Sequence, residues 1–245
     1  MVSKQEFSAR IKEFLRFSRQ ETTGLILAVL LTGFIFSFRD WGVDKFDLAL
    51  GLQHLTLVII VAAISIFFRI TCQKMYALSQ GYNAEFNIWW SGLLIMLIIA
   101  FISLGRLPVI LVGTVVSSLM VKQRLGEFRY GFSYKDNAMI ALWGLYGNLI
   151  AALLFAVALH SLPQSYFFAQ GLVLNLVMAF FSLLPLPQLD GLQIYFGSRN
   201  MYYLGIALVL LAGLLLLTKT TAGLITAIVI GSLIAIVYIL ISSEK

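Results

Sequence analysis

One apolar segment of this chain ends in the stretch Leu183-Leu184-Pro185-Leu186-Pro187-Gln188-Leu189-Asp190-Gly191. Asp190 is the only charged residue of the stretch, and its surroundings carry almost no other charge. An ionised carboxylate beside lipid hydrocarbon is costly, so acidic residues in membrane segments usually belong to functional sites. We therefore take Asp190 as the first candidate site residue, next to a membrane span.

The composition of the whole chain is that of a polytopic membrane protein. Of its 245 residues, 60% are hydrophobic and only 11% are charged, and the mean hydropathy is +0.95. These values exclude an ordinary soluble domain. The net charge of +6 does not indicate a nucleic-acid partner, because Lys and Arg of membrane proteins gather in cytoplasmic loops.

Apolar runs that reach or approach the ~20 residues of a transmembrane helix predict an all-α bundle with about seven or eight membrane segments. The expected spans lie near 22–38, 48–70, 87–103, 138–159, 167–186, 201–217 and 222–242. An eighth apolar stretch, 107–121, is either a short crossing or a re-entrant segment shielded by protein. No long polar linker separates the spans, so residues 22–245 are expected to form one transmembrane domain.

The first part of the chain differs from the rest. Residues 1–21 carry five Lys or Arg residues and three Glu residues, and apolar side chains recur among them near helical spacing. This pattern predicts a basic amphipathic helix that lies on the inner leaflet of the membrane. The alternative is a helix that docks onto a partner protein.

The distribution of Lys and Arg predicts the orientation of the chain. If 107–121 crosses the membrane, 13 of the 17 Lys and Arg residues lie on the side of the N-terminus, including those of the polar loop 122–137. If it does not cross, this loop falls on the outer side. The positive-inside rule favours the crossing, so we expect a multi-pass protein of the cell membrane with both termini in the cytoplasm.

Three patches, in order along the chain, resemble the archaeal-type branch of the site-2 proteases, which are intramembrane zinc metalloproteases. The first is the stretch 81–89, Gly-Tyr-Asn-Ala-Glu-Phe-Asn-Ile-Trp. The second matches the family's Gly-Pro-x-x-Asn at Gly144 and Asn148 but lacks the proline. The third, 182–191, has Ser in place of the family's first Asn and keeps the residues Pro185, Pro187, Asp190 and Gly191.

This resemblance covers roughly residues 48–195 and implies a site-2-protease-like helical bundle in which Asp190 corresponds to a metal ligand. In the family a His-Glu-x-x-His motif precedes the first patch; its histidines bind zinc and its glutamate activates the bound water. Here Arg69, Ile70 and Gln73 stand at the ligand, base and ligand positions. We interpret these three residues and Asp190 as a vestigial site, without a catalytic residue, a bound metal or a cofactor.

The remaining His and Cys residues do not restore a metal site. His54 and His160 are the only histidines, and neither is followed by Glu. His54 lies ~22 Å before position 69 along a continuous helix, and His160 belongs to the opposite side of the membrane in the predicted topology. Cys72 and Asp190 are the only pair left to propose, and two ligands make a poor zinc site.

Charge suggests a different role for the vestigial site. Arg69 and Asp190 both correspond to former metal ligands, so they can meet as an ion pair, with the guanidinium supplying the positive charge of the metal. In the alternative interpretation, Arg69 extends to the cytoplasmic headgroups and Asp190 only caps the segment that follows it.

Three functions follow from these observations. The leading hypothesis is a catalytically inactive membrane protein that binds or scaffolds other membrane proteins or a transmembrane helix, with lipids as its surroundings. The second is a zinc-dependent intramembrane metalloprotease with unusual ligands, or a protein classified as one by resemblance alone. The third is an ion or proton transporter in which Arg69 and Asp190 form a relay.

Overall fold

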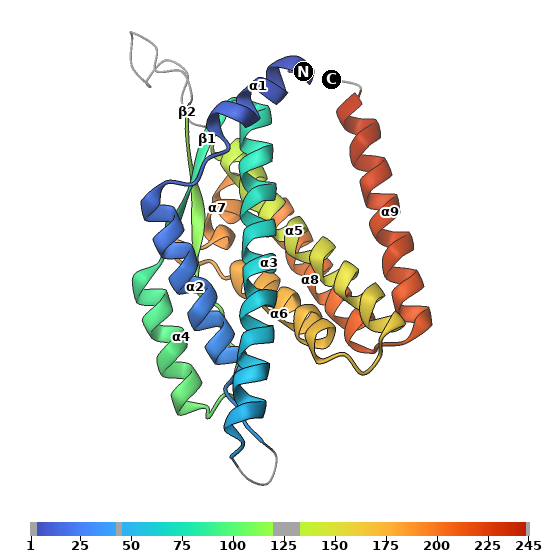
Figure 1. Cartoon of the computed structure of the whole chain (residues 1–245). Helices are drawn as coiled ribbons and strands as arrows, with labels where there is room; N and C mark the ends of the chain where they lie inside the picture. Colours follow the sequence, from blue (N-terminus) through green and yellow to red (C-terminus); the bar gives the residue numbers. More distant parts are fainter. Residues whose placement is uncertain (1–3, 43–45, 120–132, 244–245) are drawn as a thin grey trace.

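The computed structural model describes residues 4–42, 46–119 and 133–243, and helices dominate it (Figure 1). Four of the described helices are long and apolar enough to cross a membrane: α2 (Arg19–Ser37), α3 (Leu48–Gln80), α5 (Tyr134–Ser161) and α8 (Arg199–Leu217). Two shorter apolar helices, α4 (Trp90–Ile102) and α6 (Tyr166–Ser182), accompany them, and α9 (Thr221–Ser243) is apolar over Thr221–Ile234. The prediction of an all-α membrane protein is confirmed. Most of the predicted polar loop 122–137 lies outside the described residues.

Helix α3 is the central element, and it is longer than the predicted span 48–70 (Figure 1). Its 33 residues begin after Asp47, whose side chain caps the first turn, and end at Gly81, which has φ +85°. At 1.5 Å per residue the helix is about 50 Å long, more than the ~30 Å of the hydrocarbon core. The helix continues beyond the predicted span because the polar residues Gln73 and Lys74 are buried there and find partners within the protein.

Two strands interrupt the helical pattern. β1 (Tyr82–Ile88) and β2 (Gly113–Leu119) pair antiparallel, with Tyr82 opposite Leu119 and Ile88 opposite Gly113. The stretch 107–121, predicted as a short crossing or a re-entrant segment, therefore contains an extended strand that returns along β1. Helix α4 accordingly begins at Trp90 and not at residue 87, because residues 87 and 88 belong to β1.

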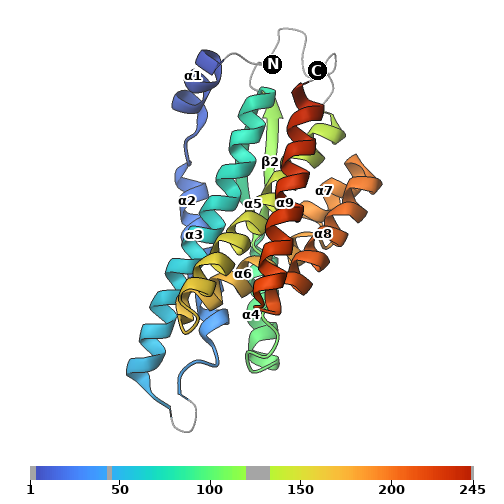
Figure 2. The same ribbon diagram turned by 90° about the vertical axis from the view of Figure 1, so that its right-hand side faces the viewer.

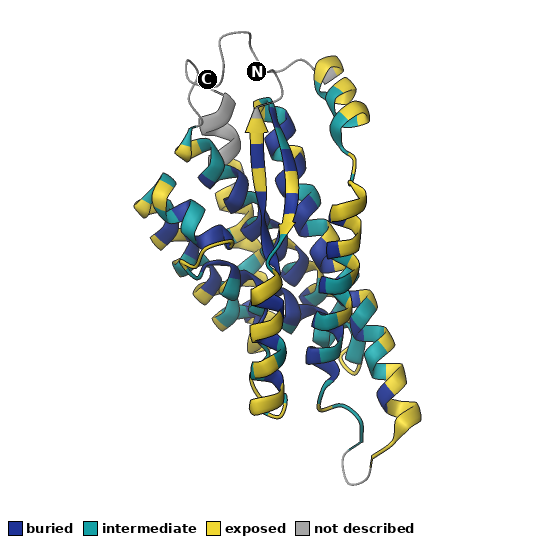
Figure 3. Cartoon of the chain, turned by 90° about the vertical axis from the view of Figure 1, so that its left-hand side faces the viewer, coloured by how far each residue is buried: buried dark blue, intermediate teal, exposed yellow. Residues whose placement is uncertain are grey.

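The two-stranded sheet faces the protein interior on one side only. Along β2 the side chains alternate, so that Val115 and Ser117 are buried while Val116 and Ser118 are exposed (Figure 3). The strand packs against α3, α5 and α7 (Asp190–Gly197), a short helix that the sequence did not predict. Pairing with β1 satisfies backbone groups of β2 that lipid could not satisfy.

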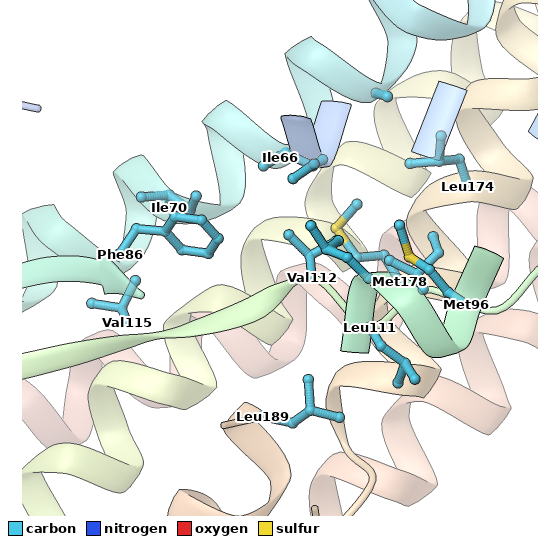
Figure 4. Packing of buried hydrophobic residues seen from close by; sticks show 14 of the residues in the cluster. Ile66, Ile70, Phe86, Met96, Leu111, Val112, Val115, Leu174, Met178 and Leu189 are labelled. Carbon is cyan, nitrogen blue, oxygen red and sulfur yellow. The ribbon is translucent and has the colours of Figure 1, made fainter. Parts of the chain in front are cut away.

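A single hydrophobic cluster joins β1 and β2 to α3 and the helices around it (Figure 4). Ile70 of α3 lies beside Phe86 of β1, with Val115 of β2 close by, and Met178 of α6 lies next to Met96 of α4. Each of these five side chains is at most 7% exposed. The two strands are therefore anchored in the core at the level of the candidate site residues of α3.

The predicted basic segment 1–21 is divided between two helices. α1 (Lys4–Phe14) lies across the end of α3, where Arg10 Nη1 donates a hydrogen bond of 3.0 Å to the carbonyl of Leu78. Ser18 then begins α2 through a capping box with Glu21. α1 and the C-terminal end of α9 lie at the same end of the bundle (Figures 1 and 2).

Candidate functional site

Helix α3 presents two of the predicted site residues on one face. Arg69 and Gln73 are four residues apart, which places their side chains one above the other on a helix. Arg69 Nη2 donates to Asp190 Oδ2 at 2.6 Å, and Gln73 Nε2 donates to the same oxygen at 3.0 Å. All three residues are at most 5% exposed. The structure thus brings Arg69, Gln73 and Asp190 together in the protein interior.

The second oxygen of Asp190 is bound by a residue that the sequence did not single out. Thr114 of β2 donates its hydroxyl proton to Asp190 Oδ1 at 2.5 Å, and Gln193 Nε2 donates to Thr114 Oγ1 at 3.0 Å. Nothing in the local sequence marks Thr114, because its importance arises from the pairing of β2 with β1 and from the approach of α7. The Asp190 carboxylate therefore accepts hydrogen bonds from α3 and from β2.

The turn before Asp190 is shaped by the residues that carry the family resemblance. α6 ends at Ser182, earlier than the predicted end at 186, and two prolines follow in a segment where Gln188 has φ +67°. A Cβ on Gly191 would lie 2.2 Å from the carbonyl oxygen of Leu183, so only glycine fits there. Asp190 is the first residue of α7, where the helix dipole favours a negative charge.

Helix α5 contributes the second motif patch to the same region. A Cβ on Gly144 would lie 2.4 Å from Gln73 Nε2, and a Cβ on Gly147 would lie 3.3 Å from the Cα of Arg69. These glycines allow α5 to pack directly against the site residues of α3. Asn148 is fully buried, and neither its side-chain oxygen nor its nitrogen has a hydrogen-bond partner within the described residues.

The other residues considered at the sequence level lie elsewhere. Ile70 is 2% exposed and lies in the hydrophobic cluster beside Phe86 (Figure 4). His54 Nδ1 is 2.8 Å from the carbonyl oxygen of Asp40, and its ring stacks on Tyr166. His160 lines a cavity between α5, α6, α8 and α9.

The chemistry available at the site follows from its donors. In the described parts of the chain, no three His, Cys, Asp or Glu residues are grouped so that they could hold a metal ion. The Asp190 carboxylate accepts three hydrogen bonds, one of them from a guanidinium that carries a permanent positive charge. This arrangement joins α3, β2 and α7, and it offers no histidine or glutamate that could activate a water molecule.

Comparisons with known proteins agree with part of this description. No protein-family model matches the chain, and no solved structure matches it. Over 180 residues the chain is 28% identical to "Putative zinc metalloprotease MJ0611" of Methanocaldococcus jannaschii, an alignment that covers 72% of this chain and 83% of that protein. The similarity extends over most of both chains and supports a metalloprotease-like family for this membrane protein.

Proposed function

We propose that this protein is a non-proteolytic relative of the site-2 proteases, in which an arginine–aspartate ion pair stands in the place of a metal centre. We propose further that it acts as a binding or scaffold subunit for other membrane proteins. One observation carries the proposal: two residues of α3, four positions apart, both donate to the same carboxylate oxygen of Asp190.

That convergence is the geometry expected of a former metal site. Two histidines at i and i+4 and a carboxylate from another helix are a common ligand set for zinc. Here Arg69 and Gln73 occupy the two helix positions, and each donates protons toward Asp190 instead of offering a lone pair to a metal. The guanidinium neutralises the carboxylate without a metal, so the helices stay connected while the chemistry is lost.

The position of Ile70 supports the same conclusion. By the family resemblance, this residue corresponds to the glutamate that activates water. Its side chain is apolar and is packed in the core beside Phe86 (Figure 4). A protein with this arrangement keeps the helical framework of the family and lacks a general base, which favours a role in binding over a role in hydrolysis.

Zinc analysis of the purified protein and of one designed variant tests the proposal. We expect the natural chain to contain no stoichiometric zinc. Because positions 69 and 73 both face Asp190, the variant Arg69→His/Gln73→His should bind about one zinc ion per chain, and adding Asp190→Asn should abolish that binding. A thermal unfolding transition in detergent, measured for each variant, shows whether that variant is still folded. About one zinc ion in the natural chain, lost on Asp190→Ala, would overturn the proposal.

A second candidate function is favoured by the name of the archaeal relative. A zinc-dependent intramembrane metalloprotease with unusual ligands would cleave a transmembrane substrate in liposomes, and a chelator would stop the cleavage. The Arg69→Met variant separates the candidates. If the protein is a protease that uses Asp190 as a metal ligand, this change should alter its cleavage rate strongly. If the protein is non-proteolytic, neither the natural chain nor the variant should cleave the substrate.

The orientation in the membrane is also a proposal, with both termini in the cytoplasm. It is supported by the common end of the bundle that α1 and the end of α9 share (Figure 1) and by the 13 of 17 Lys and Arg residues assigned to that side. Single cysteines at Glu13 and Arg106, on a Cys72→Ala background, test it. An impermeant thiol reagent added to intact cells should label position 106 and not position 13; the reverse pattern would contradict the orientation.

A further inference from the structure

A cavity of about 280 Å³ lies between α5, α6 and the hairpin of α8 and α9. Its walls are mostly apolar and include Ala156, Leu159, Leu172, Leu216 and Leu224. The volume is close to the lower end of the range of about 300–1,000 Å³ that is typical of small-molecule sites. It is too small for another helix, which is about 10 Å wide, but it has room for part of a single hydrocarbon chain.

Two basic side chains line the same cavity. His160 is in the last turn of α5, and Lys219 is in the turn between α8 and α9; both are exposed. Between Asn137 and Ser243 the sequence contains one carboxylate, Asp190, which is bound to Arg69. Within the described residues Lys219 forms no salt bridge. The rim of the cavity therefore carries positive charge, and the one acidic residue of its own helices, Asp136, is in the first turn of α5, at the other end of that helix from His160.

We propose that this cavity binds the part of one acyl chain nearest the headgroup of an anionic phospholipid, with the lipid phosphate at Lys219 and His160. The apolar walls suit the acyl chain of the lipid. The basic rim suits its anionic headgroup, since a Lys or Arg side chain near a membrane surface attracts anionic lipid. A bound lipid would connect the α8–α9 hairpin to α5 and α6. This inference is independent of the Arg69–Asp190 site and of the function proposed for it.

Lipid titration of the detergent-purified full-length chain tests the proposal. Phosphatidylglycerol should raise the unfolding temperature at lower concentrations than phosphatidylcholine with the same acyl chains, and inorganic phosphate alone should have no effect. Lys219→Gln should weaken the apparent affinity for phosphatidylglycerol about fivefold, the factor expected for one cation near the headgroup. Arg39→Gln is the matched control, because Arg39 is exposed and does not line the cavity.

A second variant tests the acyl-chain part separately. Leu224→Trp adds volume at the wall of the cavity and should reduce the binding of both lipids, while Lys219→Gln should reduce the preference for the anionic one. Equal responses to the two lipids in the natural chain would overturn the proposal. So would a full response to inorganic phosphate, or a preference for phosphatidylglycerol that Lys219→Gln leaves unchanged and Arg39→Gln abolishes.

Discussion

Helix α3 carries two buried ion pairs five residues apart, and they differ in what surrounds them. Arg69 pairs with Asp190 at 2.6 Å, and Lys74 pairs with Glu21 at 2.7 Å; every one of these side chains is at most 6% exposed. The first pair lies among side-chain donors from α3 and β2. The second lies under the N-terminal segment, where backbone groups complete the hydrogen bonding.

The difference lies in the surroundings of the two acidic groups. Glu21 accepts from Lys74, from the backbone N–H of Phe86 and from the backbone N–H of Ser18, so it connects α2, α3 and β1. Lys74 also donates to the carbonyl of Arg16. This pair has an ordinary structural role. The Arg69–Asp190 pair, in contrast, occupies positions that the family resemblance assigns to metal ligands, and Arg69 keeps an unpartnered Nε within the described residues.

The largest effect is expected when the Arg69–Asp190 pair is broken. Asp190→Ala leaves the guanidinium of Arg69 buried without its counter-charge, which should lower the unfolding free energy by about 3–5 kcal/mol. The double variant Arg69→Met/Asp190→Asn should cost less than the sum of its single variants. The measurement is a denaturant titration of each variant in detergent micelles. Additive costs would mean that Arg69 and Asp190 have no coupling energy. The contrast with the Lys74–Glu21 pair would then have no energetic basis.

A smaller and more local effect is expected at the second pair. Glu21→Gln removes the counter-charge of Lys74, but a glutamine can still accept the hydrogen bond from the backbone of Phe86. We expect a loss of about 1.5–3 kcal/mol, together with faster hydrogen exchange at the start of α2. The matched control is Glu6→Gln, which breaks an exposed pair with Arg10 and should cost less than about 1 kcal/mol. Equal losses for the two variants would contradict a buried structural role for Glu21.

The packing of α5 against the first pair can be tested with two neighbouring glycines. Gly144→Ala places a Cβ where Gln73 now lies, and should cost about 1–3 kcal/mol because the side chain must move away from Asp190. Gly147→Ala meets its nearest atoms at 3.3 Å and should cost less. Thermal unfolding of both variants gives the ranking. A larger loss of stability for Gly147→Ala than for Gly144→Ala would mean that the tightest contact of α5 is not at Gly144.

The smallest effect is expected at alkaline pH, at the start of β1. Burial, together with the hydrogen bond from the Tyr82 hydroxyl to Asp136, raises the pKa of Tyr82 to about 12. A folded-state pKa above the usual value near 10 means that the stability is fully present below pH 10 and is lost as the pH rises toward 12. Between pH 9 and pH 11 the natural chain should lose about 1 kcal/mol that Tyr82→Phe does not lose. An identical pH dependence in both proteins would rule out this contribution.

The sequence alone determined the class of the protein and its first candidate site residue. The apolar runs predicted the helices, because composition and hydrophobic periodicity are properties that each segment has by itself. Asp190 was identified because a carboxylate is rare in such surroundings. The motif context marked Gly144 and Gly191 in the sequence. The reason why each must be glycine is visible only in the packed structure, where an added Cβ would lie 2.2–2.4 Å from its nearest neighbour.

Only the tertiary structure decided which groups meet. Thr114 lies 76 residues from Asp190, and nothing in the sequence predicted their contact. Arg69 lies 121 residues from Asp190, and their ion pair was expected only from the family resemblance. No local pattern encodes contacts at such separations, because they depend on how α3, β2 and α7 pack. The strand within 107–121 has the same explanation. The apolar composition of this stretch suits a membrane helix, but pairing with β1 and burial against α3, α5 and α7 favour the extended conformation.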